Sequence, residues 1–165
     1  MAATFEHLSI GDFQLKYSRS ERAYEYWHGR AIPKAMPTWV HAFLQFLISN
    51  LLFEAGYKPG PEVDLRIAPD AIPRPDIIAT RGKLEHPYPT KAVEVVVEIL
   101  SPDDSMSYLL EKCSAYQEWG FEFIYVVDPE SRRVYRWTAN SLQNVTTLVS
   151  IPVAEIWKKL DEALA

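Results

Sequence analysis

The segment from Ala92 to Leu100 constrains the fold more than any other part of the sequence. Five of its nine residues are valine or isoleucine, the residue types that best fit a buried, pleated strand. Because side chains alternate along a strand, Glu98 shares one face with Val96, while Val97 and Ile99 point the other way. Burying an unpaired carboxylate costs several kcal/mol. An ionised Glu98 in this strand therefore needs compensation, and a cation is one form of it.

Helical and strand-like patterns alternate on both sides of this segment. Apolar residues at helical spacing predict one helix from Pro37 to about Ala55 and a second from about Ser105 to Trp119. The glycines that directly follow each pattern are typical helix ends. A third helix, amphipathic, is predicted to follow Pro152. The predicted strands are 22–27, 31–36, 62–67, 75–80, 92–100, 121–127, 133–137 and 145–149.

Residues 1–20 are polar and predicted to be irregular, and 69–73 is predicted to be a turn. Together the elements predict an α/β (α+β) fold, in which a mixed β-sheet is flanked by helices. An N-terminal β-hairpin precedes this sheet and a C-terminal amphipathic helix follows it.

Length and composition limit the classes of protein that this chain can belong to. With 165 residues we expect one domain, 1–165, with a core over about 22–138 and a C-terminal extension over 139–165. A net charge of −5 excludes a uniformly basic nucleic-acid coat but allows a local basic groove. The single cysteine, Cys113, excludes a disulfide framework and is interpreted as a core thiol.

Signals for export and for membrane insertion are absent from the sequence. Residues 1–10 contain charged and polar side chains and lack the apolar stretch of a secretory signal. No segment approaches the roughly 20 apolar residues of a membrane helix. We therefore expect a cytoplasmic protein that does not bind membranes.

Two carboxylates on neighbouring predicted strands suggest a metal site. Asp76 lies at the start of the strand 75–80, and Glu98 lies near the end of its own strand. The two could share a hard divalent ion such as magnesium with a backbone carbonyl. Lys112, on the following helix, could point to the same place and orient a water molecule. The alternative is an ordinary ion pair, since a glutamate in a strand pairs with lysine or arginine far more often than it binds metal.

Other polar residues have weaker signals. His41 and Gln45 lie one turn apart on the polar side of the first long helix, where a solvated face is the favoured interpretation. Glu62 is either close to Asp76 across a strand pair or simply exposed. Asp103 and its neighbour Asp104 are interpreted as a helix-capping pair.

Several short motifs together carry a resemblance to a known family. They are Pro75-Asp76, Glu98 within Val-Val-Glu-Ile-Leu-Ser-Pro, Lys112 with Tyr116, Val127-Asp128-Pro129, Gly29, Ile32-Pro33-Lys34, Pro37-Thr38 with His41, and Glu62. With these motifs the sequence resembles the bacterial Uma-two family of restriction-endonuclease-like proteins, in the PD-(D/E)XK nuclease superfamily. The resemblance runs from about Tyr24 to Trp137.

The resemblance implies a restriction-endonuclease-like core and a DNA substrate. Asp76, Glu98 and the backbone carbonyl of Ile99 would ligate magnesium or manganese. The superfamily lysine usually stands two residues after the acid, where this chain has Leu100, and Lys112 matches the helix lysine that replaces it in this family. Its role would be to orient the attacking water and to offset phosphate charge.

The chain departs from the family pattern at two positions. Arg30 stands where the family often has an acid, and Tyr108 stands where it often has an aspartate. An aspartate there would pair with Lys112 at i, i+4, so Tyr108 is expected to leave this lysine without that partner. We regard Glu62, His41 and Tyr108 as accessory site residues.

These observations favour a metal-dependent endonuclease that hydrolyses DNA phosphodiester bonds. Because each chain has one site and DNA has two strands, we expect a homodimer or a higher homo-oligomer. Candidate DNA contacts are Arg30, Lys34, Arg132 and Arg133.

The alternative is a catalytically weak or inactive nuclease-fold module that serves nucleic-acid binding or protein assembly. A third possibility is that Asp76 and Glu98 act as general acid and base on another substrate. No glycine-rich phosphate loop is present, so no nucleotide cofactor is expected.

Overall fold

The computed structural model describes residues 7–165 of the chain, which form four helices and eleven strands. The helices are α1 (Ile10–Tyr17), α2 (Trp39–Glu54), α3 (Met106–Trp119) and α4 (Val153–Leu164). The strands are β1 (Tyr24–Trp27), β2 (Arg30–Pro33), β3 (Lys58–Pro61), β4 (Ala71–Ile72), β5 (Ile77–Thr80), β6 (Val95–Ile99), β7 (Phe123–Asp128), β8 (Arg133–Thr138), β9 (Ser141–Val145), β10 (Thr147–Leu148) and β11 (Ile151–Pro152).

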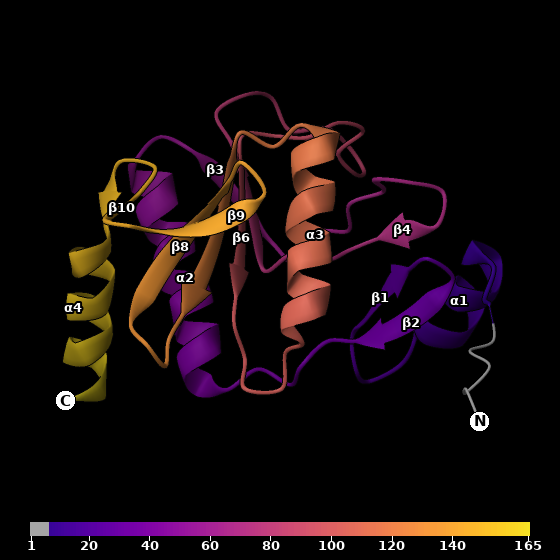
Figure 1. Cartoon of the computed structure of the whole chain (residues 1–165), viewed down its shortest axis with the longest axis horizontal. Coiled ribbons are helices and arrows are strands. Elements are labelled where there is room, and N and C mark those ends of the chain that lie inside the picture. Colours follow the sequence, from indigo (N-terminus) through magenta and orange to yellow (C-terminus); the bar gives the residue numbers. More distant parts are fainter. Residues whose placement is uncertain (1–6) are drawn as a thin grey trace.

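A six-stranded mixed sheet in the order β3-β5-β6-β7-β8-β9 forms the centre of the molecule (Figure 1). All neighbouring pairs are antiparallel except β6 and β7, which run parallel and are joined through α3. A parallel pair requires such a long crossover, and a helix is its usual form. Strands β2, β1 and β4 make a separate small sheet. The predicted α+β fold with a mixed sheet and an N-terminal hairpin is confirmed.

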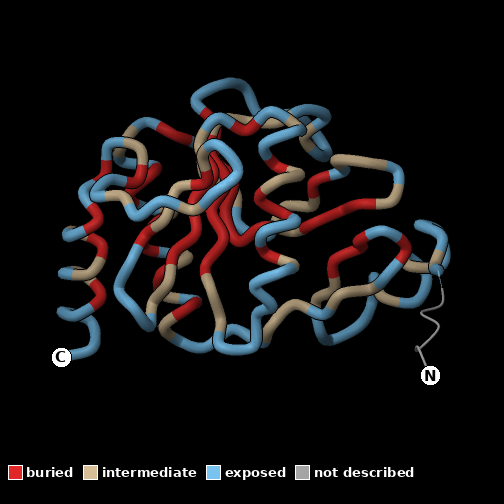
Figure 2. The backbone as a smooth tube through the Cα atoms, in the orientation of Figure 1, coloured by how far each residue is buried: buried red, intermediate tan, exposed pale blue. Residues whose placement is uncertain are grey.

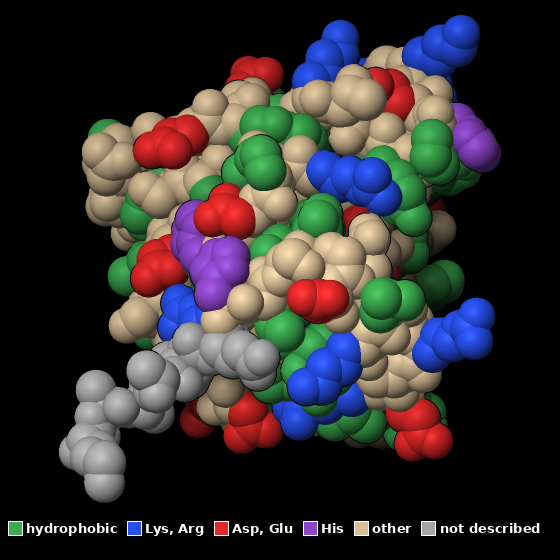
Figure 3. Space-filling model, turned by 90° about the vertical axis from the view of Figure 1, so that its right-hand side faces the viewer, with side chains coloured by type: hydrophobic (Ala, Val, Ile, Leu, Met, Phe, Trp, Pro, Cys, Tyr) green, Lys and Arg blue, Asp and Glu red, His purple; other side chains and the backbone are tan. Residues whose placement is uncertain are grey.

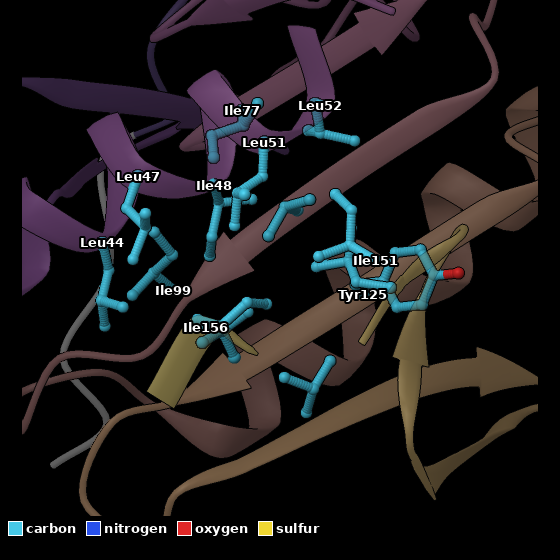
Figure 4. Close-up of a cluster of buried hydrophobic side chains, with 14 of the residues drawn as sticks. Leu44, Leu47, Ile48, Leu51, Leu52, Ile77, Ile99, Tyr125, Ile151 and Ile156 are labelled. Carbon is cyan, nitrogen blue, oxygen red and sulfur yellow. The ribbon is translucent and has the colours of Figure 1, made fainter. Parts of the chain in front are cut away.

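Helices cover both faces of the large sheet, and each face has its own hydrophobic cluster. On one face α2 and α4 form a cluster with Val97 and Ile99 of β6, and Figure 4 shows Leu44 and Leu47 of α2 next to Ile99. On the other face Val96 packs with the apolar residues of α3. The predicted alternation along β6 is therefore confirmed, and Figure 2 shows that the central strands are buried.

Local capping explains why the two long helices begin where they do. The Thr38 hydroxyl accepts a hydrogen bond from the His41 amide (3.1 Å), and the Ser105 hydroxyl accepts one from the Tyr108 amide (3.3 Å). Each satisfies a free N–H of the first turn. Asp104 does not cap α3, because its carboxylate accepts from the Ser101 amide instead (2.7 Å). The predicted capping pair is therefore wrong.

The predicted strand 62–67 is wrong, and the strand β3 lies just before it. Glu62 has a φ of 55°, which breaks the extended backbone and turns the chain out of the sheet. Strand β3 contains two prolines, Pro59 and Pro61. They are tolerated because β3 is an edge strand, hydrogen-bonded to β5 alone.

Three further expectations need correction. The region 1–20, predicted as irregular, contains α1, whose first turn is capped by the Ser9 hydroxyl; residues 1–6 of that region lie outside the described part. The predicted turn 69–73 contains β4, which pairs with β1. The last predicted strand, 145–149, is divided between the end of β9 and the short β10.

Within residues 7–165, no helix is both long and apolar enough to cross a membrane. Cys113 is fully buried on α3, and burial raises the pKa of its thiol to about 12. This agrees with the predicted core thiol.

Candidate functional site

A cavity of about 800 Å³ opens where four parts of the fold meet. Its walls come from the β1–β2 hairpin, the start of α2, the adjoining ends of β5 and β6, and one face of α3. Three carboxylates in its lining are almost fully buried: Glu25, Asp76 and Glu98. Such a concentration of buried acids needs positive partners, and these decide what the site can do.

The β5–β6 register brings Asp76 and Glu98 to the same end of the sheet. Ile77 lies opposite Val97 in this antiparallel pair, so Asp76 and Glu98 occupy the next positions outward. Asp76 Oδ2 accepts a hydrogen bond from the Ile99 amide at 2.7 Å. That contact ties the carboxylate of one strand to the backbone of its neighbour.

Lys112 lies between two of the buried acids. Its Nζ is 3.0 Å from Glu98 Oε1 and 3.2 Å from Glu25 Oε1. One turn further along α3, the Tyr116 hydroxyl donates to Glu98 Oε1 at 2.6 Å. Burial raises the pKa of Glu98 to about 7; Lys112 opposes this shift, while Asp76 and Glu25 add to it. The positive charge around Glu98 therefore does not fully compensate the buried acids.

Glu25 is a site residue that the sequence analysis missed. It lies on β1 and is buried, with Oε2 accepting from the Arg74 amide at 2.6 Å and Oε1 accepting from the Tyr108 hydroxyl at 3.1 Å. An acid between aromatic residues in a short predicted strand was the available signal, analogous to that of Glu98. Its partner Lys112 is 87 residues away in the sequence, which no local pattern reveals.

Tyr108 offers Lys112 no carboxylate at i, i+4, but other groups of the fold surround this lysine. Lys112 contacts two carboxylates, and its Nζ lies 4.8 Å from the centre of the Tyr108 ring, in cation–π geometry. Burial opposes the charge of Lys112, but the negative charges of Glu98 and Glu25 outweigh it and hold the pKa of this lysine well above its ordinary value. The folded site therefore favours the charged form of Lys112.

A second lysine, Lys34, also reaches the acids. Its Nζ lies 2.9 Å from Glu62 Oε2 and 3.3 Å from Asp76 Oδ1, and it donates to the Arg74 carbonyl at 2.7 Å. Only 13% of its side chain is exposed. Burial opposes its charge, but the nearby carboxylates, Asp76 foremost, raise its pKa. Predicted as a DNA contact, this ammonium instead points into the acidic cluster.

His41 and Gln45 belong to the site, so the interpretation of a solvated helix face is wrong. His41 is buried, with Nε2 3.4 Å from Asp76 Oδ2. Gln45 donates to the Asp76 carbonyl (2.8 Å) and to Glu62 Oε1 (3.2 Å). Burial works against the charge of both Asp76 and His41, yet their mutual hydrogen bond lowers the pKa of Asp76 and raises that of His41.

The remaining candidate DNA contacts are divided between two places. Arg30 is exposed and lines the cavity. Arg132 pairs with Asp161 of α4 at 2.8 Å and lies over the Trp157 ring, and neither it nor Arg133 belongs to the cavity lining. On the face shown in Figure 3, acidic and basic side chains of the described residues are mixed and no continuous basic area is seen.

The donor set suits a hard divalent cation. Asp76, Glu98 and the Ile99 carbonyl are oxygen donors of the kind that magnesium and manganese prefer. The three buried carboxylates contact two ammonium groups, that of the buried Lys112 and that of the partly buried Lys34. Burial, to which Asp76 and Glu25 add, raises the pKa of Glu98 to about 7. Among residues 7–165, no three histidine, cysteine or acidic side chains are arranged as ligands around one point. Two side chains and a carbonyl would therefore have to be completed by water.

Comparison with known proteins identifies what this chain is similar to. The Uma2 family, described as "Putative restriction endonuclease", matches residues 10–159. The crystal structure of "a putative nuclease belonging to DUF820" from Anabaena variabilis superposes with a TM-score of 0.75 at 19% identity, covering 93% of this chain and 99% of that one. The Anabaena variabilis protein and this chain therefore have the same fold.

A second solved structure is more distant. The cryo-EM structure of the DrdV–DNA complex matches with a TM-score of 0.44 at 18% identity, over 73% of this chain and 11% of that one. No curated protein matches the chain.

Proposed function

Because the chain belongs to the Uma2 family, we propose that it is a metal-dependent endonuclease that hydrolyses phosphodiester bonds in DNA, with the whole chain as one restriction-endonuclease-like domain. The observation that carries the proposal is the meeting of Asp76, Glu98 and Lys112 in one cavity. Asp76 and Glu98 would hold magnesium or manganese together with the Ile99 carbonyl. When bound, the ion supplies Lewis acidity and lowers the pKa of water.

Lys112 acts through its charge in this proposal. A raised pKa keeps it protonated at neutral pH, so it cannot serve as the base that removes a proton from water. It can donate hydrogen bonds to a water molecule and stabilise the negative charge that develops on the phosphate. Glu25 and Tyr108 are proposed as positioning residues, since Glu25 accepts a hydrogen bond from Lys112 and the Tyr108 hydroxyl donates one to Glu25.

DNA is the proposed substrate and a homodimer the proposed working form. One site per chain and two strands per duplex favour two copies. With a net charge of −5, the protein is expected to bind DNA weakly unless divalent ions offset its acids. Arg30, which lines the cavity, would contact a DNA phosphate in this proposal.

One observation favours a second candidate function, a nuclease-fold module without catalysis. The Lys34 ammonium contacts the Asp76 carboxylate, so a bound metal ion would have to compete with Lys34 for this carboxylate. If that contact persists, the fold would serve binding or assembly only.

The test is cleavage of supercoiled plasmid and of single-stranded DNA with magnesium or manganese. We expect cutting by the wild type and none by Asp76→Ala or Glu98→Ala. Glu94→Gln is the matched control, because Glu94 stands directly before β6 at the strand end opposite Glu98, and its carboxylate accepts hydrogen bonds from the Arg81 amide and from Thr80. Cutting that survives both alanine substitutions would refute the site, and DNA binding without cutting would support the module.

A further inference from the structure

Three large aromatic side chains project from α2 into solvent. Trp39 is 89% exposed, Phe46 is 68% exposed and Phe53 is 66% exposed. They stand seven residues apart, so they form a single row on the helix face opposite the buried leucines. We call Trp39, Phe46 and Phe53 the aromatic stripe. Exposed apolar area concentrated in this way marks an interaction surface.

We infer that the aromatic stripe is the surface through which a second copy of this chain binds, with the two α2 helices antiparallel. The inference deepens the proposed homodimer and rests on it for the identity of the occupant. The stripe is symmetric about Phe46, with one aromatic residue seven positions before it and one seven positions after it. A twofold axis through Phe46 therefore places Trp39 of one copy against Phe53 of the other, as an isologous contact requires.

The exposed area of the aromatic stripe is consistent with binding of a second copy of the chain. At about 200 Å² for each aromatic side chain, the three rings expose about 450 Å². A specific dimer buries about 800 Å² on each partner, so the rings alone supply roughly half of it. Helix α2 has 16 residues and a length of about 24 Å, enough for neighbouring side chains to contribute the remainder.

The charges of α2 also favour an antiparallel partner. The first turn contains no acidic residue and the last turn no basic one, so the residues of these two turns carry no charge that opposes the helix dipole. Glu54 lies at the negative end, where its charge is unfavourable. In an antiparallel pair Glu54 of one copy lies beside the positive end of the other α2, near Thr38.

The position of the cavity beside this surface gives it a functional consequence. His41 and Gln45 line the cavity, as does Ala42, which lies one turn before Phe46 on the same helix face. A dimer through the aromatic stripe would therefore fix the two cavities relative to each other through a single rigid helix pair.

Sedimentation velocity of the full chain at micromolar concentration tests the association. We expect the wild type at twice its 18.9 kDa mass. Phe46→Glu, which puts two like charges at the axis, should weaken the dimer by about tenfold or more with unchanged circular dichroism, because Phe46 is exposed. Leu15→Glu is the control, since Leu15 is 85% exposed on α1 and outside the stripe. A monomeric wild type, or a dimer that Phe46→Glu leaves intact, overturns the inference whether or not the protein cleaves DNA.

Engineered disulfides test the geometry. Phe46→Cys should form a covalent dimer under mild oxidation, because residue 46 faces its own copy across the axis. Asn50→Cys should not, since antiparallel packing places position 50 opposite position 42 of the partner. Cys113 does not interfere, because it is buried and its thiol pKa is raised to about 12. Cross-linking through position 50 but not through position 46 would overturn the antiparallel arrangement.

Discussion

Glutamine in place of Glu98 should change how the stability of the protein depends on pH. Glu98 is buried, and its pKa rises from 4.5 to about 7 in the folded state. Between these two values the folded protein keeps a proton that the unfolded chain releases. The free energy of unfolding therefore falls as pH rises through this interval. The contribution of Glu98 is fully present below about pH 4.5 and is lost by about pH 7.

The size of the effect follows from the shift. A difference of about 2.5 pKa units, at about 1.4 kcal/mol per unit, corresponds to a loss of about 3 kcal/mol in wild-type stability across this range. The amide side chain of the Glu98→Gln variant has no proton to lose in this range and has nearly the same shape. Relative to wild type, the unfolding free energy of Glu98→Gln should therefore be about 3 kcal/mol higher at pH 8 than it is at pH 4.

Urea unfolding followed by tryptophan fluorescence, in chelator and at several pH values, measures this difference. Glu94→Gln is again the control: burial works against the charge of Glu94, but its hydrogen bonds lower its pKa, so removing it should shift the pH dependence slightly the other way. Parallel stability curves for wild type and Glu98→Gln would refute the argument that Glu98 is an incompletely compensated acid. A larger slope in the variant would refute it as well.

Three further substitutions probe the site and the core. Lys34→Met removes a cation from Asp76 and should lower the unfolding free energy by about 3 kcal/mol in chelator; manganese should raise the melting temperature of this variant more than that of wild type, and equal responses would contradict competition between Lys34 and the ion. Tyr108→Phe removes a hydrogen bond to Glu25 and should cost about 1 to 2 kcal/mol in urea unfolding, so an unchanged midpoint would contradict its positioning role. Leu44→Ala, in the fully buried cluster under α2, should cost about 2 to 5 kcal/mol in the same assay, and a cost below about 1 kcal/mol would mean that the cluster is loosely packed.

Local sequence patterns predicted the features of the fold that depend on interactions between nearby residues. The apolar alternation of β6, the helix of Lys112 and its end at Gly120 all depend on residues within a few positions of one another. Gly120 has a φ of 118°, a conformation that glycine adopts without strain. The pairing of Asp76 with Glu98 could be predicted as well, because it needs only two adjacent strands.

Long-range contacts were beyond these patterns. Glu25 meets Lys112 across 87 positions and Lys34 meets Asp76 across 42. Both contacts come from the β1–β2 hairpin or the residue directly after it, and no helix or strand periodicity connects that segment to the site. A solvated face was the favoured interpretation of His41 because Gln45 lies one turn away, whereas the carboxylate that His41 contacts, Asp76, comes from another element. The predicted strand 62–67 failed for a related reason, since alternation of side chains cannot reveal the positive φ of Glu62.

The two prolines of β3 have a consequence for how these molecules can meet. Proline has no backbone N–H. A strand from another protein that aligned along this edge would therefore receive no backbone hydrogen bond from Pro59 or Pro61. Open sheet edges are the usual starting points for fibril growth and for uncontrolled aggregation. The edge beside α2 is therefore protected by its own backbone, and contact between copies on this side of the molecule must be made by side chains.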